Sequence, residues 1–116
     1  MANTFKIKTN DAMPTSAGTP LTLYTVPGST TTIVLGLMLC NIDTSQRLVD
    51  VHIESDTSDT ETNSNVHAIK DAPIPAGSTL EVMAGNKVVL QATDVLKIDC
   101  DVAGKIDATL SIMEIT

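Results

Sequence analysis

Two histidines and two cysteines are the side chains best suited to metal or thiol chemistry in this 116-residue chain. His52 and His67 are its only imidazoles, and the interval between them matches neither an HxH nor an HxxxH ligand pair. A zinc site normally takes three or four protein ligands. We therefore interpret both histidines as surface residues and expect no metal site.

The two cysteines lie on segments that we expect to be strands facing the core. In immunoglobulin domains a buried Trp packs against the disulfide and a Tyr marks the corner of a strand. This chain has no Trp. Asp94 stands six residues before Cys100, as in the immunoglobulin corner, but Ile98 occupies the place of the corner Tyr. We favour two buried free thiols at Cys40 and Cys100, with a disulfide between them as the alternative.

Three carboxylates near the C-terminus are candidates for acid–base chemistry, since a desolvated carboxyl group has a raised pKa. Asp99, Asp101 and Asp107 lie on the outward faces of two predicted strands joined by a glycine turn, and they alternate with Lys97 and Lys105. Cross-strand charge pairing is the simpler interpretation. The chain also lacks a GxSxG motif. We expect no catalytic residue and no cofactor, and a protein that is not an enzyme.

The segments that would position these residues are short, rich in Thr, Val and Ile, and separated by turn residues, which is typical of strands. Their number and spacing predict an all-β, single-domain antiparallel β-sandwich of about eight strands, either jelly-roll or immunoglobulin-like. The predicted strands are Leu21–Val26, Thr31–Asn41, Arg47–Glu54, Val66–Lys70, Leu80–Met83, Val88–Gln91, Val95–Val102 and Ile106–Ile115.

Two of these strands carry more apolar residues than one buried face requires. Thr31–Asn41 is apolar on both faces and predicts a central strand that is covered on both sides. Met113 falls out of phase with Ile112, so the last strand is either buried on both faces or carries a bulge. A partner subunit would explain burial on both faces. In contrast, Ser55–Asn65 has no apolar residue and predicts a protruding acidic loop.

The first ten residues predict an extended N-terminal arm, residues 1–10, followed by the sandwich domain, residues 11–116. Phe5 and Ile7 fall on one side of the arm, and Lys6 and Lys8 fall on the other. Such an arm could add a strand to the sheet edge of another subunit. The alternative is an ordinary first strand of the same domain. The hypothetical subunit or virion interface is therefore Phe5, Lys6, Ile7, Lys8, Met113 and Ile115.

Charge and composition exclude several classes of partner. The chain has 14 acidic and seven basic residues, a net charge of −7, one Phe, one Tyr and no Trp. Nucleic-acid binding needs clustered Lys and Arg or aromatic platforms for bases, so we expect no nucleic-acid partner. No segment has the roughly 20 apolar residues of a membrane span. The N-terminus has no signal-peptide pattern, which predicts synthesis in a cytoplasm.

A family resemblance covers nearly the whole chain. It is carried by MANTFKIKT, LYTVPGSTTTIVLGLMLCNID, VDVHIESDTS and the C-terminal block PIPAGSTLEVMAGNKVVLQATDVLKIDCDVAGKIDATLSIMEIT. These segments resemble small virion structural proteins of tailed bacteriophages, notably those of marine cyanobacteria. The resemblance implies a non-enzymatic β-sandwich located in the virion.

Within that class we expect a capsid decoration or cement protein. It would self-associate, with a trimer as the simplest guess, and bind the major capsid protein or other virion proteins. Symmetric association would close the exposed edges of its sheets. A neck, tail or fibre-attachment component is the alternative in the same class. A host-glycan-binding module is the alternative from another class, although Tyr24 and Phe5 are its only aromatic side chains.

Overall fold

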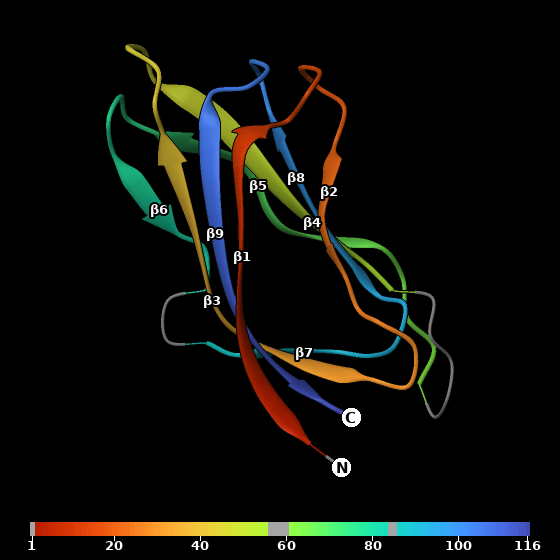
Figure 1. Cartoon of the computed structure of the whole chain (residues 1–116). Coiled ribbons are helices and arrows are strands. Elements are labelled where there is room, and N and C mark those ends of the chain that lie inside the picture. Colours follow the sequence, from red (N-terminus) through yellow and green to blue (C-terminus); the bar gives the residue numbers. More distant parts are fainter. Residues whose placement is uncertain (1, 56–60, 84–85) are drawn as a thin grey trace.

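The computed structural model describes residues 2–55, 61–83 and 86–116 (Figure 1). This part of the chain contains no helix, and therefore none that could cross a membrane. Its strands are β1 (Asn3–Met13), β2 (Leu21–Thr25), β3 (Thr31–Asn41), β4 (Arg47–Glu54), β5 (Val66–Ile74), β6 (Thr79–Glu81), β7 (Val88–Leu90), β8 (Val95–Cys100) and β9 (Ile106–Ile115).

The strands form two antiparallel sheets. The first has the order β1-β9-β3-β6, with β7 also paired to β3, and the second has the order β2-β8-β4-β5. The chain changes sheet at each step from β1 to β4, and its first and last strands are neighbours. In an immunoglobulin sandwich the first strand instead pairs with the second. The predicted β-sandwich is confirmed, and its connectivity is that of a jelly roll.

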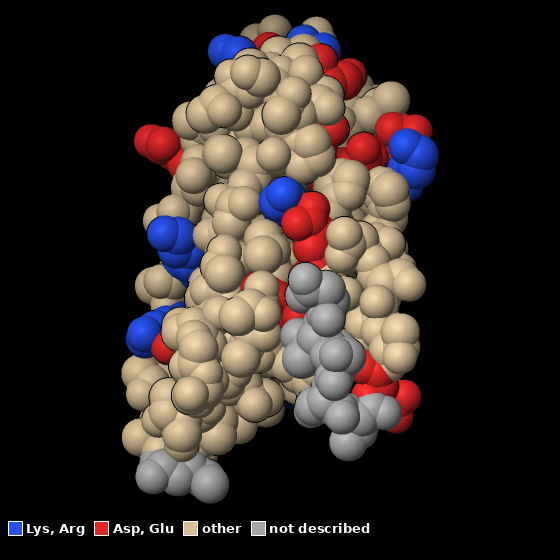
Figure 2. Space-filling model, turned by 90° about the vertical axis from the view of Figure 1, so that its right-hand side faces the viewer, with Lys and Arg blue, Asp and Glu red and all other residues tan. Residues whose placement is uncertain are grey.

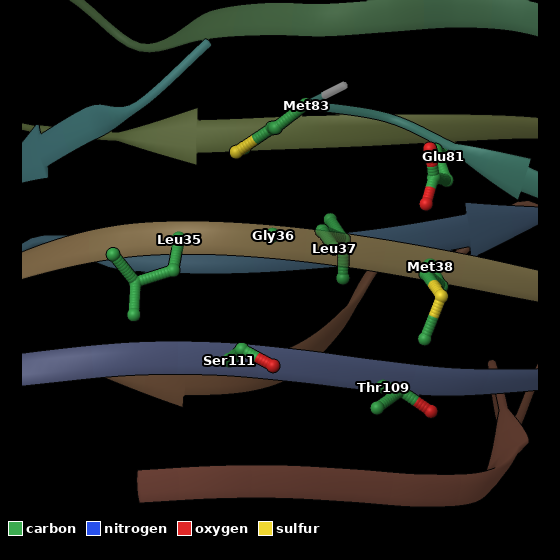
Figure 3. Close-up of a pocket in the computed structure, with 8 residues that line it drawn as sticks. All are labelled: Leu35, Gly36, Leu37, Met38, Glu81, Met83, Thr109 and Ser111. Carbon is green, nitrogen blue, oxygen red and sulfur yellow. The ribbon is translucent and has the colours of Figure 1, made fainter. Parts of the chain in front are cut away.

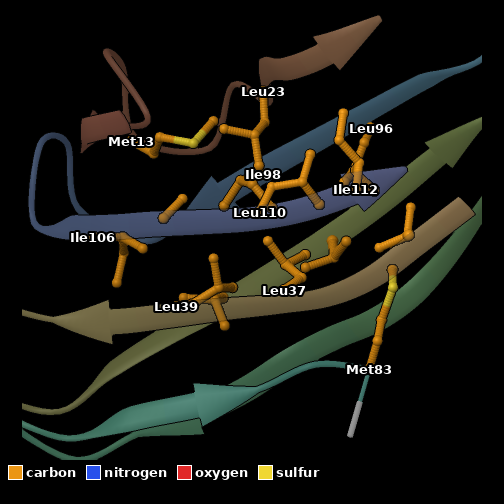
Figure 4. Close-up of a cluster of buried hydrophobic side chains, with 14 of the residues drawn as sticks. Met13, Leu23, Leu37, Leu39, Met83, Leu96, Ile98, Ile106, Leu110 and Ile112 are labelled. Atoms are coloured by element: carbon orange, nitrogen blue, oxygen red, sulfur yellow. The ribbon is translucent and has the colours of Figure 1, made fainter. Parts of the chain in front are cut away.

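The core lies between the two sheets and is almost entirely aliphatic (Figure 4). The inward residues of the long strands alternate with outward ones, as period-two strands require. Burial of each large side chain contributes roughly 1.5–3 kcal/mol. Fully buried residues include Val34, Leu37 and Leu39 of β3, Val49 and Val51 of β4, Leu96 and Ile98 of β8, and Leu110 and Ile112 of β9.

The N-terminal segment forms a strand of the sandwich and not a free arm. β1 pairs with β9 from Asn3 opposite Ile115 to Met13 opposite Ile106, so the expected boundary between residues 10 and 11 falls inside it. Met13, at the end of β1, is fully buried in the core. The sequence could not decide this point because an arm and a first strand share the same alternating pattern.

The apolar face of β3 that points away from the core is not covered by any described part of the chain. We expected this strand to be covered on both sides, but Leu35 and Met38 are 38% and 40% exposed. The last strand does not carry the bulge that was one of its two predicted explanations, and its burial against a partner subunit stays a prediction. The irregularity lies on β3, between Val34 and Gly36, opposite a regular β9.

Several strand boundaries match the prediction and others do not. Thr31–Asn41, Arg47–Glu54 and Ile106–Ile115 have the predicted bounds. β5 extends through Pro73, which an edge strand tolerates. β8 and β9 lie in different sheets, so they cannot form the charge pairs expected between them. The acidic residues Asp56 and Asp59 of the predicted loop lie outside the described residues.

Candidate interaction surface

The outward face of the first sheet carries a group of apolar side chains, which we call the outer apolar face. Register places Phe5 opposite Met113, and Met113 opposite Ile33, so β1, β9 and β3 each contribute to one row. Val89 of β7 lies opposite Ile33 and extends the row. The outer apolar face comprises Phe5, Ile7, Ile33, Leu35, Met38, Val89, Met113 and Ile115.

This face is more exposed at its margins than at its centre. Phe5 is 71% exposed, Ile7 is 69% and Val89 is 61%, whereas Met113 and Ile115 are half-buried between neighbouring strands. Single exposed apolar residues are ordinary on protein surfaces, but a contiguous group on one sheet face marks an interaction site. Four of the six predicted interface residues, Phe5, Ile7, Met113 and Ile115, belong to it.

A shallow depression of about 270 Å³ lies on the same face, next to the irregularity in β3. Figure 3 shows Leu35 and Met38 on β3, with Glu81 and Met83 to one side and Thr109 and Ser111 of β9 to the other. Met83 is buried, and Gly36 adds no side chain at the centre. The lining therefore combines apolar side chains with the carboxylate of Glu81 and the hydroxyl groups of Thr109 and Ser111.

The two predicted interface lysines point to the other side of β1. Lys6 forms an ion pair of 2.7 Å with Glu114, whose side chain is only 7% exposed. The Tyr24 hydroxyl donates to the second carboxylate oxygen of Glu114 at 2.6 Å and lies 2.8 Å from the Thr32 hydroxyl. This buried polar cluster ties β1 to β2, β3 and β9. Lys6 is therefore engaged within the chain.

The same cluster shifts two pKa values in opposite directions. The hydrogen bond from Lys6, and then that from Tyr24, lower the pKa of Glu114 below its usual range. Burial, and then the hydrogen bond to Glu114, raise the pKa of Tyr24 from 10.0 to about 12. Both shifts favour ionised Glu114 beside neutral Tyr24 at neutral pH. With its hydroxyl occupied and its ring half-buried, Tyr24 offers little surface for stacking on a sugar.

Charged residues form no large patch on the side of the molecule drawn in Figure 2, where acidic and basic side chains lie scattered among uncharged ones. Arg47 contacts Asp43 at 2.6 Å, and Lys97 contacts Glu54 at 3.0 Å. The pairing of Lys97 with β4 replaces the expected pairing with β9.

The remaining candidate residues fall in separate places. Cys100 is buried in the core, but Cys40 is half-buried on the outward side of β3 because Leu39 and Asn41 beside it point inward, so the expectation that both face the core was wrong for Cys40. Both cysteines are free. His52 and His67, interpreted as separate surface residues, lie directly opposite each other on β4 and β5.

Comparisons with known proteins add one structural likeness. No family model matches the chain, and no curated protein sequence matches it. Among solved structures, a chain of the Bacillus endospore appendages, described as a novel family of disulfide-linked pili, superposes with a TM-score of 0.50 at 13% identity. The match covers 100% of this chain and 91% of that chain. At this identity the likeness supports the sandwich fold alone.

Proposed function

We propose that this chain is a non-enzymatic structural protein of bacteriophage virions, a capsid decoration or cement protein that self-associates and binds the major capsid protein. The observation that carries the proposal is the outer apolar face. Exposure of these grouped apolar side chains to water is unfavourable, and contact with another protein would bury them.

The charge of the chain favours a second copy as one occupant of this face. Each copy carries −7, so two copies repel each other unless they meet through a surface with few acidic groups. The outer apolar face is such a surface, since Glu81 is the one acidic residue among those that line its depression. β1 is also an edge strand whose outer side has no partner in the described chain, and edges of this kind pair with other chains.

A neck, tail or fibre component is the second candidate. The structural neighbour comes from a pilus, which is an extended polymer of subunits, and a sandwich of similar fold here would suit a filamentous or ring-shaped assembly. The neighbour is described as disulfide-linked, whereas the cysteines of this chain are free. We therefore propose association without a covalent link between subunits.

A density map of the whole phage particle tests the proposal and separates the two candidates. Decoration predicts tens to hundreds of copies over the capsid, while a neck or tail ring predicts roughly six to twelve copies. Absence of the chain from purified particles would contradict both.

The alkylation rate of Cys40 provides a second measurement in solution. Cys40 lies on the outward side of β3 whereas Cys100 is buried, so Cys40 is the thiol that a reagent reaches in the folded chain. Assembly through the outer apolar face would slow its alkylation. The alkylation of Cys40 is identified by its loss in a Cys40→Ser variant. An unchanged alkylation rate in assembled particles would argue against the outer apolar face as the contact.

A further inference from the structure

The second sheet carries a cluster of metal-ligating side chains that is unrelated to the outer apolar face. Asp50, His52 and His67 each offer one ligand atom, and these atoms lie within 4.8 Å of one another. The two imidazole rings have centroids 4.3 Å apart and are tilted by 47°. We infer that these three residues form a binding site for a divalent transition-metal ion such as Zn²⁺.

Two irregularities in β5 build the cluster. Val51 lies opposite Ile69 whereas His52 lies opposite His67, so Ala68 is an extra residue on β5. In a regular ladder continued from Val51 and Ile69, His52 would lie opposite Ala68 and not His67. A bulge is a common device for re-aiming one side chain near a functional site. Here it brings the second imidazole to the first.

The second irregularity orients the carboxylate. Val49 lies opposite Ala72, so β5 again has one residue more than β4 over this interval. Asp71 within it has a φ of 51°, which is unusual for a residue other than glycine. In this conformation its N–H donates to Oδ1 of Asp50. A carboxylate has about four lone-pair directions, so Asp50 keeps capacity for a metal ion.

The electrostatic surroundings favour a cation. Asp50 lies directly opposite Asp99 on β8, a like-charge pair that is unfavourable across two strands. The neighbouring positive charge, on Lys97, is paired with Glu54 at 3.0 Å. Nε2 of His52 is buried and has no hydrogen-bond partner among the described residues. A bound dication would offset the acidic pair and occupy the lone pair of this nitrogen.

The donor set indicates the kind of metal. Two imidazoles and one carboxylate suit Zn²⁺ and neighbouring transition metals, whereas Ca²⁺ and Mg²⁺ prefer oxygen ligands alone. His67 is exposed on an edge strand, so the remaining coordination positions are open to water or to a ligand from a partner protein. Binding of Zn²⁺ would require the three ligand atoms to take up positions at tetrahedral spacing around the ion.

Zinc titration of the full chain, followed by NMR of the imidazole signals, tests this inference. The chain has two histidines, so both signals are assigned by one substitution. We expect one Zn²⁺ per chain to shift both signals with a single saturation curve. His67→Gln, at an exposed position, should weaken binding by at least about tenfold, and Asp50→Asn should also weaken it.

The matched control is Asp11→Asn, which removes an exposed carboxylate from the other sheet and should leave zinc affinity unchanged. Calorimetry gives stoichiometry and affinity, and the melting temperature with and without Zn²⁺ reports coupling to folding. Signals that move independently, or a His67→Gln variant that binds zinc as well as the parent chain, would mean an adventitious ion only and would overturn the site.

Discussion

The ammonium group of Lys6 lies 2.7 Å from the carboxylate of Glu114, across the β1–β9 ladder. Lys6 is about half exposed, whereas Glu114 is buried between the sheets. A buried carboxylate that loses its cation keeps its desolvation cost. The ion pair therefore fastens the N-terminal strand to the sandwich.

Replacement of this lysine by an uncharged side chain of similar length should destabilise the fold. We expect Lys6→Met to lower the free energy of unfolding by about 1–3 kcal/mol, because Glu114 then keeps only its bond from Tyr24. Chemical denaturation gives the value. Lys8→Met is the control, since the described residues include no ion pair for Lys8. Equal effects of the two substitutions would contradict this role of Lys6.

The single tyrosine provides a direct reading of the same cluster. The pKa of Tyr24 is raised from 10.0 to about 12, first by burial and then by the hydrogen bond to Glu114. The unfolded chain releases the phenolic proton near pH 10 while the folded chain retains it. The resulting stabilisation is complete below pH 10 and is lost as the pH rises towards 12.

Ultraviolet absorbance of tyrosinate measures this titration without interference from other tyrosines. We expect the folded chain to ionise near pH 12 and the chain in denaturant to ionise near pH 10. Glu114→Gln should lower the folded value, because it removes the negative charge beside the hydroxyl. An unchanged titration in this variant would leave burial as the cause.

The strand bounds could be predicted where apolar alternation and turn residues agree, as they do for β3, β4 and β9. The pairing of strands could not, because period-two patterns do not state which sheet a strand joins. The approach of His52 and His67 depends on an extra residue at Ala68, which shifts the register by one. The prediction that β3 is covered on both sides within the chain was also wrong. Its apolar pattern is the same whether a partner protein or the chain itself covers the second side.

Asn41 is a buried polar residue whose importance the sequence did not indicate. It ends the predicted strand Thr31–Asn41 and is fully buried, and its Nδ2 donates to the carbonyls of Ser45 and Ile74 at 2.8 and 2.9 Å. Its Oδ1 accepts from the Asp43 N–H. It therefore joins the turn after β3 to the end of β5.

We expect Asn41→Ala to lower the free energy of unfolding by about 2–4 kcal/mol, since it leaves the buried carbonyl of Ile74 without this donor. Denaturant titration measures the loss. Asn10→Ala is the matched control, because the Asn10 side chain accepts one local bond from Ala12 at an exposed position. Similar losses in both variants would show that Asn41 acts only through its local turn.

Association through the outer apolar face predicts that one charge on β1 is enough to weaken it. Ile7 is 69% exposed at this face, so Ile7→Lys should leave the fold intact, with a melting temperature close to that of the parent chain. A desolvated, unpaired ammonium at a subunit contact is costly. We therefore expect the variant to shift towards monomer in sedimentation experiments and to attach less to particles.

Leu48→Lys is the matched control for this experiment. Leu48 is 37% exposed on β4 in the second sheet and is not a member of the outer apolar face, and the substitution adds the same charge to an exposed apolar strand residue. It should leave association unchanged. Substitution is preferable to deletion of Thr4–Thr9, since deletion would also remove the Lys6–Glu114 pair and the strand that covers the edge of β9. If Leu48→Lys dissociates the assembly and Ile7→Lys does not, the contact lies on the second sheet and the proposed interface is wrong.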